Sequence, residues 1–196
     1  MITRLSDGEL DLIFRSARTA NVYQDREITV AQLHEIWDVM KWAPTSANCM
    51  PARIVWCLSS DAKGKLAECA SANNRRRVLA APVTAIVGMD LEFYEKLPDL
   101  YPEADARSWF VGNEQVIRDT AFRNSSLQGA YLIIAARALG LAAGPMSGLD
   151  NAAVDEAFFS GTTVRSNFIM TLGYAEPATH RPRGPRMAFE EANSVA

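Results

Sequence analysis

The stretch from Arg118 to Gly148 constrains the fold of this chain more than any other part of the sequence. Its first segment, Arg118 to Leu139, contains no proline and is rich in Ala, Leu and Ile. Such a segment predicts an α-helix of about six turns, roughly 33 Å long at 1.5 Å per residue, which is enough to cross a small domain. Ala130 to Ala136 is almost wholly apolar, so little of this helix can face water. We expect a central, buried helix with small residues near one end, namely Ser125, Ser126, Gly129 and Ala130.

The residues after this helix predict a cap, a strand and a loop. Gly140 is placed to end the helix in a left-handed conformation, which glycine adopts at little steric cost. Leu141 to Ala143 can form a short strand, and Gly144 to Gly148 reads Gly-Pro-Met-Ser-Gly, which predicts a loop. We expect this loop to expose its backbone N–H groups.

Length and charge limit the classes of function. With 196 residues the chain fits a single domain, 1–196, with a substantial core, or one protomer whose core is completed by a second copy. A formal net charge of -3 argues against a general nucleic-acid binder, which needs clustered positive charge over a wide face. Met1 to Ala20 lacks the apolar core of a signal peptide, and no apolar run approaches the roughly 18 residues of a membrane span. We therefore expect a soluble, cytoplasmic protein without a membrane segment.

The cysteines and histidines predict neither a metal site nor a side-chain nucleophile. Cys49, Cys57 and Cys69 form no CxxC pair, and with only His34 and His180 they make no ordinary zinc set. The sequence also suggests no Cys-His or Ser-His-Asp arrangement. We expect the cysteines to be reduced and mostly buried. We expect no catalytic side chain, so the chemistry would come from a bound anionic cofactor with its own reactivity.

The N-terminal part of the chain predicts two capped helices. Ser6 would cap a helix that runs to about Ala20, because Glu9 follows three residues later and apolar residues recur at helical spacing. Arg15 and Arg18 would lie on one face of that helix, either as a cradle for a phosphate or as a solvated charged face. Thr29 would cap a second helix that runs to about Lys41. Its buried stripe would be Leu33, Ile36, Trp37 and Met40.

The remaining elements alternate irregularly between strands and helices. The expected strands are Ala52 to Ser59, Pro82 to Met89 and Ser166 to Tyr174, and the expected helices are Asp61 to Ala70, Asn74 to Ala80 and Asn151 to Phe159. This order predicts an α+β fold with a mixed sheet of four or five strands and helices on both faces. No GxGxxG follows a strand and no GxxxxGK[ST] occurs, so neither a Rossmann nor a P-loop nucleotide site is predicted.

Four segments leave alternatives open. On composition alone, the loop from Trp42 to Pro51 is a structural loop and the basic run from Asn73 to Arg77 is a surface feature. Asp90 to Gly112 mixes aromatic residues with prolines and acids, which fits either a flap over a cavity or a satellite core under a long loop. The basic tail from Pro177 to Arg186 is either a disordered end or an arm laid on another subunit.

Four motifs, in this order and spacing, resemble the FMN-dependent nitroreductase family over nearly the whole chain. They are Arg15-Ser16-Ala17-Arg18, Ala43-Pro44-Thr45-Ser46-Ala47-Asn48, Gly140-Leu141 with the Gly144 to Gly148 segment, and the C-terminal arginines. The resemblance implies a nitroreductase-like homodimer with FMN at each of two interface sites and C-terminal arms exchanged between protomers. It also implies NADPH or NADH as the electron donor.

The resemblance further implies which residues hold the phosphate of FMN. Arg15, Ser16 and Arg18 would bind the phosphate and ribityl end, because arginine forks match phosphate oxygens. Arg183 and Arg186 would close over the phosphate. The tail can also be aligned so that Arg181 and Arg183 take that role.

Other residues would hold the flavin ring. Asn74 would bond the pyrimidine edge, and Arg77 would stabilise negative charge at N1 and O2 of the reduced flavin. Ser147 and Gly148 would present backbone N–H groups to the N5 side of the ring. The other subunit would line the ring with Pro44, Thr45, Ser46 and Asn48.

Within the family the chain is similar to the reductases of malonic semialdehyde (3-oxopropanoate) in pyrimidine utilisation. The closer match lies in Lys41 to Cys49, Asp105 to Phe110 and Thr120 to Ser126. It implies a ping-pong cycle in which 3-oxopropanoate, a small carbonyl acid, becomes 3-hydroxypropanoate. The carboxylate of this substrate needs a cation, and our candidates are Arg107 and Arg123.

One departure from the family pattern weighs against nitroaromatic substrates. Many members have Asn-x-Gln-Pro-Trp, whereas Asn48 to Ala52 reads Asn-Cys-Met-Pro-Ala and lacks the amide and the aromatic ring. A general quinone or nitro reductase is the second hypothesis. A flavin-binding dimer without turnover is the third.

Overall fold

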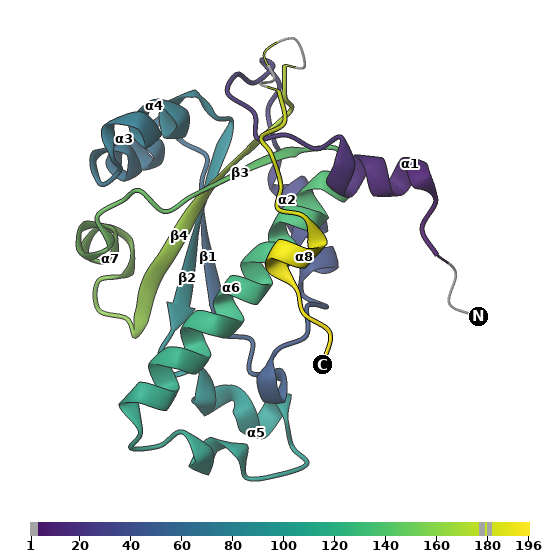
Figure 1. Cartoon of the computed structure of the whole chain (residues 1–196). Helices are drawn as coiled ribbons and strands as arrows, with labels where there is room; N and C mark the ends of the chain where they lie inside the picture. The colour runs from purple at the N-terminus through teal and green to yellow at the C-terminus, as the bar shows by residue number, and fades with distance from the viewer. Residues whose placement is uncertain (1–3, 177–178, 180–181) are drawn as a thin grey trace.

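A four-stranded sheet lies at the centre of the computed structural model, which describes residues 4–176, 179 and 182–196 (Figure 1). Its strands are β1 Ala52–Cys57, β2 Val83–Asp90, β3 Ala142–Met146 and β4 Val164–Gly173, in the order β1-β2-β4-β3. The α+β class and the strand number are confirmed. The expected mixed sheet is wrong, because each of these strand pairs is antiparallel. Between β1 and β2, for example, two successive helices bring the chain back to the end of the sheet at which β1 finishes. β2 therefore starts beside the last residue of β1 and runs in the opposite direction.

Helices cover both faces of the sheet, as predicted (Figure 1). The helices α2 (Val30–Met40) and α6 (Glu114–Ala138) pack on one face. The other face carries α3 (Ser60–Glu68), α4 (Ala72–Ala80) and α7 (Asn151–Phe159). Side chains of β2 alternate between the two cores: Val83, Ala85 and Val87 face α2 and α6, and Ile86 faces α3 and α7. The sheet therefore has a hydrophobic core on each side.

The first helix has the predicted start but ends earlier than expected. Ser6 caps α1 (Asp7–Leu10) in a reciprocal capping box with Glu9, and a π-helical turn, Asp11–Arg15, follows. The expected continuation to Ala20 is wrong. Arg137 and Arg183 donate to the carbonyls of Ile13 and Phe14 in this turn, so these groups gain partners without an extension of the helix. The cap of α2 at Thr29 is confirmed, and Gln32 completes its capping box.

The long helix is confirmed and starts four residues before the predicted Arg118. Asn113 caps α6 by accepting a hydrogen bond from the N–H of Val116. At the other end Gly140 has φ +80, and the N–H groups of Gly140 and Leu141 donate to the carbonyls of Arg137 and Ala136. This pair of bonds is a Schellman cap, which requires the left-handed residue that the sequence places there.

The expectation that little of α6 faces water is wrong for the single chain. One face is buried against the sheet, including Leu132, Ala135 and Ala136. The opposite face leaves large apolar side chains exposed, namely Val116, Phe122, Leu127 and Tyr131. The apolar composition of the helix therefore exceeds what one chain can bury.

The small residues of α6 allow close approach of β4. The β2–β4 register shifts at Val87/Gly88 and leaves Asn167 as a bulged residue, whose amide donates to the hydroxyls of Ser125 and Ser126 at 2.9 Å. The next residue, Phe168, lies directly over Gly129. A Cβ at position 129 would sit 2.4 Å from Cζ and 2.8 Å from Cε1 of that ring.

We expect Gly129→Ala to destabilise the protein by about 1–3 kcal/mol, because the added methyl overpacks against the ring of Phe168, which packs against the core. Gly64→Ala is the matched control: this helical glycine has nothing within 4 Å of its Cβ position. It should gain about 0.5–1 kcal/mol from helix propensity alone. Urea unfolding of both variants measures the difference, and equal stabilities would show that Phe168 moves without cost.

The segment from Asp90 to Gly112 forms a satellite core, one of its two expected interpretations. It contains the 3-10 turn Phe93–Lys96, the helix α5 (Leu97–Leu100) and the 3-10 turn Ala106–Trp109. The buried side chains of this cluster are Cys49, Phe93, Leu97, Ala106, Phe110, Ile117 and Ala121. Edge-to-face packing of Phe93 and Phe110, with centroids 4.9 Å apart, holds it together.

The cysteines are free thiols, as predicted. Cys49 and Cys57 are buried, and burial raises the pKa of each thiol to about 11. Cys69 is partly exposed. Protonated, buried thiols are poor nucleophiles, so these cysteines serve the core.

The C-terminal segment does not pack into either core. Residues 182–196, including the short helix α8 (Phe189–Ala192), are exposed throughout. Met187 and Phe189 are 68% and 61% exposed, which is unusual for such side chains unless another surface covers them. No helix among the described residues has the length and hydropathy needed to cross a membrane.

Candidate functional site

The expected loop from Gly144 to Gly148 is only partly a loop. Gly144, Pro145 and Met146 belong to β3 and pair with β4, so the prediction is wrong for these three residues. Proline is compatible with this position because β3 is an edge strand. Ser147 and Gly148 leave the sheet, and no described residue accepts a hydrogen bond from either N–H group. These two backbone donors are free.

Asn74 and Gly148, two predicted site residues, lie in direct contact. The side-chain amide of Asn74 and the backbone N–H of Ser71 both donate to the carbonyl of Gly148 at 3.0 Å. A Cβ at position 148 would sit 2.7 Å from Nδ2 of Asn74 and 2.9 Å from Oγ of Ser71. The start of α4 is therefore docked on the end of β3, and only glycine leaves room for this contact.

Arg77 extends the same site by one helical turn. Its Nη2 donates to Oδ1 of Asn21 at 3.0 Å, and a cavity of about 620 Å³ opens beside the pair. Asn21, Asn73, Asn74, Arg76, Arg77 and Ala80 line this cavity. The predicted pair Asn74 and Arg77 thus faces one space that is rich in hydrogen-bond donors.

The middle of β3 is packed against hydroxyl groups. Tyr23 donates to Oγ1 of Thr171 at 2.8 Å, and Thr171 donates to the carbonyl of Gly144 at 3.3 Å. Burial raises the pKa of Tyr23, although its bond to Thr171 and the charge of Arg77 oppose the shift. A Cβ at Gly144 would lie 2.6 Å from Oγ1 of Thr171 and 3.2 Å from Cγ2 of Thr19. Gly144 therefore leaves room for Thr171 and Thr19 to approach the strand.

Arginines gather at the start of β3. Ser16 and Arg18 line a cavity of about 300 Å³ together with Arg137 and Gly140. Arg183 donates to the carbonyls of Phe14, Arg15 and Ala17, so the C-terminal segment reaches this place within one chain. The bonds of Arg186 go to the carbonyls of Gly184 and Pro185. The alternative partner Arg181 lies outside the described residues.

Arg15 does not join this group. It forms ion pairs with Asp7 at 2.9 Å and with Asp11 at 2.7 Å. Because the helix ends at Arg15, the expected shared helical face of Arg15 and Arg18 does not exist. The structure brings Ser16, Arg18 and Arg183 together and leaves Arg15 with two carboxylates.

The Pro44–Asn48 segment lies at the other end of the sheet. The N–H of Ser46 donates to Asn124 of α6 at 2.8 Å, and the amide of Asn48 donates to the carbonyl of Leu100 at 2.9 Å. Figure 1 shows α5, which ends at Leu100, at the opposite end from α4. Thr45 accepts from the N–H of Met50 at 3.2 Å. One chain therefore does not bring this segment to Asn74 and Gly148.

The same segment is strained. Ala47, Asn48 and Met50 have φ of 48, 49 and 38, in the left-handed region that residues other than glycine seldom adopt. Three such residues in four positions are held by the hydrogen bonds to α5 and α6. Strain of this kind concentrates at functional sites, which supports the prediction that this is more than a structural loop.

The two candidate substrate cations have different surroundings. Arg107 forms a bidentate ion pair with Glu95 at 2.8 and 2.7 Å, which raises the pKa of Arg107 and lowers that of Glu95. Arg123 is exposed on α6 and has no ion pair with a described residue. It lines a cavity of about 490 Å³ with Asp119, Phe122, Ser126 and Leu127. Arg123 is therefore the one whose guanidinium is open to a ligand.

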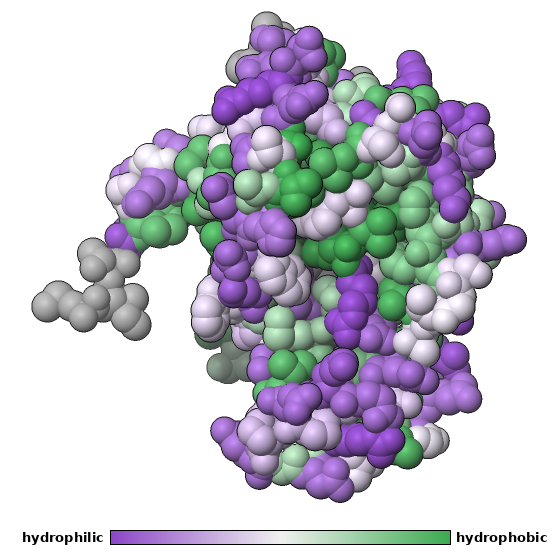
Figure 2. All heavy atoms as spheres, turned by 180° about the vertical axis from the view of Figure 1, so that it is seen from behind, coloured by the Kyte–Doolittle hydropathy of each residue, from purple (hydrophilic) through white to green (hydrophobic). Residues whose placement is uncertain are grey.

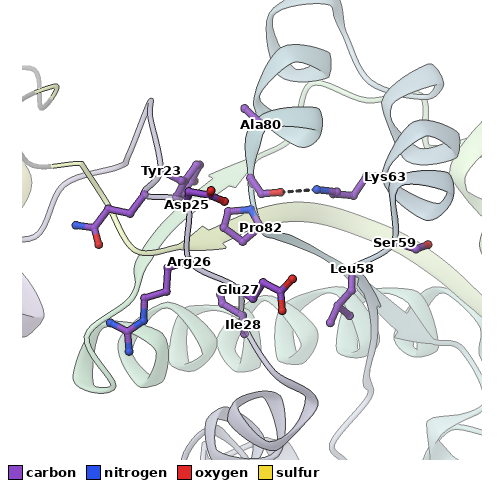
Figure 3. A pocket seen from close by; sticks show the side chains of 12 residues that line it. Tyr23, Asp25, Arg26, Glu27, Ile28, Leu58, Ser59, Lys63, Ala80 and Pro82 are labelled. Carbon is purple, nitrogen blue, oxygen red and sulfur yellow. Dashed lines mark hydrogen bonds between the residues drawn. The ribbon is translucent and has the colours of Figure 1, made fainter.

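Another cavity, of about 710 Å³, has none of the predicted site residues in its lining (Figure 3). Figure 3 shows Tyr23 and Asp25 on one side and Lys63 and Ser59 on the other, with Pro82 between them. The ammonium group of Lys63 donates to the carbonyl of Ala81 at 2.9 Å. Charges of both signs line the space, since Arg26 and Glu27 also contribute. Its size alone assigns it no ligand.

Several residues of the site were not predicted from the sequence. They are Thr19, Asn21, Tyr23, Ser71, Arg137 and Thr171. Asn21 reaches Arg77 across 56 positions and Tyr23 reaches Thr171 across 148, so no local pattern announces them.

The molecular surface carries uncovered apolar regions. Seen from behind, a hydrophobic band crosses the middle of the molecule (Figure 2). Trp37, Ile54 and Trp56 line an apolar groove of about 500 Å³ between α2 and the edge strand β1. Together with the exposed face of α6, these surfaces are candidates for contact with another chain.

The fold and this geometry define an α+β protein with a polar site along its edge strand β3. Arginines lie at one end of the strand, and an asparagine, an arginine and two free N–H groups lie at the other. Among the described residues no three side chains of the metal-ligating types come together.

The chain belongs to the nitroreductase family, whose sequence model matches residues 15–174. It is 58% identical over 190 residues to a protein of Burkholderia lata that is provisionally named an NADH dehydrogenase/NAD(P)H nitroreductase. That alignment covers 97% of each chain.

Solved structures share the fold. The ydfN protein of Bacillus subtilis has a TM-score of 0.86 at 24% identity, covering 97% of this chain and 100% of that one. A protein of Exiguobacterium sibiricum, solved in complex with FMN, has a TM-score of 0.85 at 19% identity and covers 100% of both chains. The nitroreductase-like fold predicted from the sequence is confirmed.

Proposed function

We propose that the chain is an FMN-dependent oxidoreductase that takes electrons from NADH or NADPH and works as a homodimer of single-domain protomers. The observation that carries this proposal is the division of donors along β3. Guanidinium groups without carboxylate partners lie at its start, and Asn74, Arg77 and the free N–H groups of Ser147 and Gly148 lie at its end. FMN has a phosphate at one end and a hydrogen-bonding ring at the other, which fits this division.

The groups at the end of β3 have roles that suit a flavin. Side chains at positions 144 and 148 would collide with Thr171, Asn74 and Ser71, so glycine at both places lets these neighbours pack against the strand. When bound, FMN would accept a hydride from the nicotinamide and pass it to the second substrate. The N–H groups of Ser147 and Gly148 would orient the ring, and Arg77 would stabilise negative charge on it.

Arg18, Ser16, Arg183 and Arg186 are the proposed phosphate ligands. Arg15 was assigned to the same role, but it would have to leave Asp7 and Asp11 to reach a phosphate. The structure therefore favours Arg18. Its hydrogen bonds to described residues come from Nη1 alone, so the rest of its fork is available.

Arg18→Ala should weaken FMN binding by about 1.5–3 kcal/mol, the usual cost of losing a hydrogen bond to a charged group. The measurement is quenching of flavin fluorescence on titration with flavin-free protein. Arg118→Ala, an exposed arginine paired with Glu114 on α6, is the control for loss of one positive charge. Unchanged affinity in Arg18→Ala would refute the assigned role.

The second subunit would complete the ring site. Pro44, Thr45, Ser46 and Asn48 cannot reach Asn74 within one chain, but the exposed apolar face of α6 gives a second copy a surface to bind. Their anchoring on α6 through Asn124 supports this arrangement, since a partner that packs on α6 also meets the strained segment. The exposed C-terminal segment would lie on that partner as an arm.

We propose 3-oxopropanoate as the second substrate, with reduction to 3-hydroxypropanoate, in the cytoplasm and in pyrimidine degradation. The open guanidinium of Arg123 beside Phe122 supports a small acid as the ligand.

The alternative is a general NAD(P)H quinone or nitro reductase, which the name of the Burkholderia lata relative favours. Steady-state rates on 3-oxopropanoate and on menadione separate the two, and a carbonyl rate at background would remove the first. Protein that binds FMN and turns over neither compound would support a flavin-binding dimer without activity.

Arg123→Met should lower kcat/KM for 3-oxopropanoate by about 10- to 100-fold, because the substrate carboxylate loses its charged partner. Its rate on menadione, which has no carboxylate, should not change. Arg107→Met is the matched control, since Glu95 already occupies that guanidinium. Equal effects of the two substitutions would contradict the assignment of Arg123.

A further inference from the structure

Three arginines at the start of β3 lack any acidic partner. Arg18, Arg137 and Arg183, here called the arginine cluster, form no ion pair with a described residue. Several arginines elsewhere in the chain have such a partner, for example Arg53 with Asp90 and Arg107 with Glu95. The cluster therefore concentrates positive charge that the protein itself does not neutralise.

Helix capping explains part of this arrangement. The cluster donates to the carbonyls of the segment that ends the first helix: Arg137 to Ile13 at 3.0 Å, Arg18 and Arg183 to Ala17 at 3.0 and 3.2 Å. Such bonds satisfy carbonyls that have no partner within the helix. Each guanidinium has five N–H donors, however, and these bonds use one terminal nitrogen of each residue.

Arg137 shows that capping is not the whole explanation. Its Nε is buried and has no hydrogen-bond partner among the described residues. A buried donor without a partner is rare in folded proteins and costs free energy. Arg137 also lines the cavity of about 300 Å³ that contains Ser16, Arg18 and Gly140. A ligand in that cavity would contact Arg137, whose Nη1 makes the only hydrogen bond of its guanidinium to a described residue.

The charges of the cluster repel one another. Burial and the charge of Arg183 lower the pKa of Arg137, and desolvation together with the charges of Arg18 and Arg186 lowers that of Arg183. Repulsion of this kind destabilises the folded chain until an anion relieves it. The free N–H donors and the positive charges of the cluster thus favour binding of an anion with several acceptor oxygens.

We propose that Arg137 is a third cation of the phosphate site, and that the flavin-free protein binds inorganic phosphate between Arg137, Arg18 and Arg183. The identification of the natural ligand as the phosphate monoester of FMN rests on the proposed function. The existence of the anion site does not rest on the proposed function. A phosphate dianion has three acceptor oxygens for three guanidinium groups, whether or not it is attached to a flavin. Nothing in the sequence motifs assigned Arg137 to binding.

The test compares FMN with riboflavin, which has the same ring and no phosphate. Arg137→Met should weaken FMN binding by about 10- to 100-fold and leave riboflavin binding unchanged. Arg137→Lys, which keeps the positive charge, should reduce the affinity for FMN by a smaller factor. Arg118→Met on the same helix should change neither affinity. An Arg137→Met variant that loses both flavins equally, or neither, would overturn the proposal, because a purely structural cap does not discriminate between them.

A second measurement covers the case in which the protein binds no flavin. Inorganic phosphate should raise the Tm of the flavin-free wild-type protein more than chloride does at equal ionic strength, and Arg137→Met should abolish the difference. If wild-type protein binds neither flavin but keeps this phosphate effect, the proposed function fails and the anion site stands. If phosphate acts no differently from chloride on the wild-type protein, the anion site is wrong.

Discussion

Gly148→Val is expected to abolish measurable FMN binding, with a loss of affinity of at least about 100-fold, while the protein remains folded. The carbonyl of Gly148 accepts from both Asn74 and Ser71, and even a Cβ would lie 2.7 and 2.9 Å from their side-chain atoms. Both side chains must move to admit a branched residue. Asn74 then leaves the position from which it would bond the flavin ring, and the valine covers the free backbone N–H groups.

Backbone strain does not confuse this test, because φ of Gly148 lies outside the left-handed region. Gly112→Ala provides the opposite control: φ is +81 there and the Cβ position is open, so the substitution strains the backbone away from the site. It should cost about 1 kcal/mol of stability and leave flavin affinity unchanged. Flavin titration and thermal unfolding of both variants are the measurements. Wild-type affinity in Gly148→Val would remove Gly148 and Asn74 from the site.

The sequence predicted those features of the fold that depend on neighbours within a few positions. Ser6 and Thr29 are the caps because hydroxyl groups there reach N–H groups three residues on. Gly140 ends α6 because a left-handed residue is needed there. The family motifs extended the prediction to Asn74 and Gly148, which the structure brings into contact across 74 positions.

Contacts between distant segments set the limits of that prediction. The helix expected to reach Ala20 stops at Arg15, where side chains from α6 and the C-terminal segment supply donors to its carbonyls. Helical spacing cannot reveal such partners. For the same reason the sequence did not predict the ion pairs of Arg15 with Asp7 and Asp11 or the bond from Arg137 to the carbonyl of Ile13.

The prediction from composition that little of α6 faces water was also wrong for the single chain. The apolar run from Ala130 to Ala136 predicts burial, and on the sheet side the helix is indeed buried. The other face remains open in one chain, with Phe122 56% and Leu127 46% exposed. A sequence records that a surface is apolar but not whether the covering group comes from the same chain. The excess of apolar surface is thus evidence for a partner, and it supports the proposed homodimer.

Leu127→Glu should convert the proposed dimer into monomers and, with them, abolish FMN-dependent activity. A carboxylate in an apolar interface loses its hydration, and Arg123 one turn earlier recovers only part of that loss. We expect a cost of about 3–5 kcal/mol, or a factor of about a hundred to several thousand in the dimer dissociation constant. Flavin affinity should fall together with dimerisation, because Pro44 to Asn48 would come from the second subunit. Analytical ultracentrifugation over a range of concentrations, with flavin bound and removed, measures both effects.

Leu5→Glu is the control for an exposed leucine changed to an acid, since Leu5 is 45% exposed and lies before α1. It should leave the sedimentation of the protein unchanged. Leu127→Glu monomers should keep the thermal stability expected of a folded chain, because the substituted side chain lies on the outer face of α6. If these monomers bind FMN as tightly as the wild-type protein does, each chain holds a complete site. In that case the strained Pro44–Asn48 segment has no part in flavin binding, and the two-subunit site is wrong.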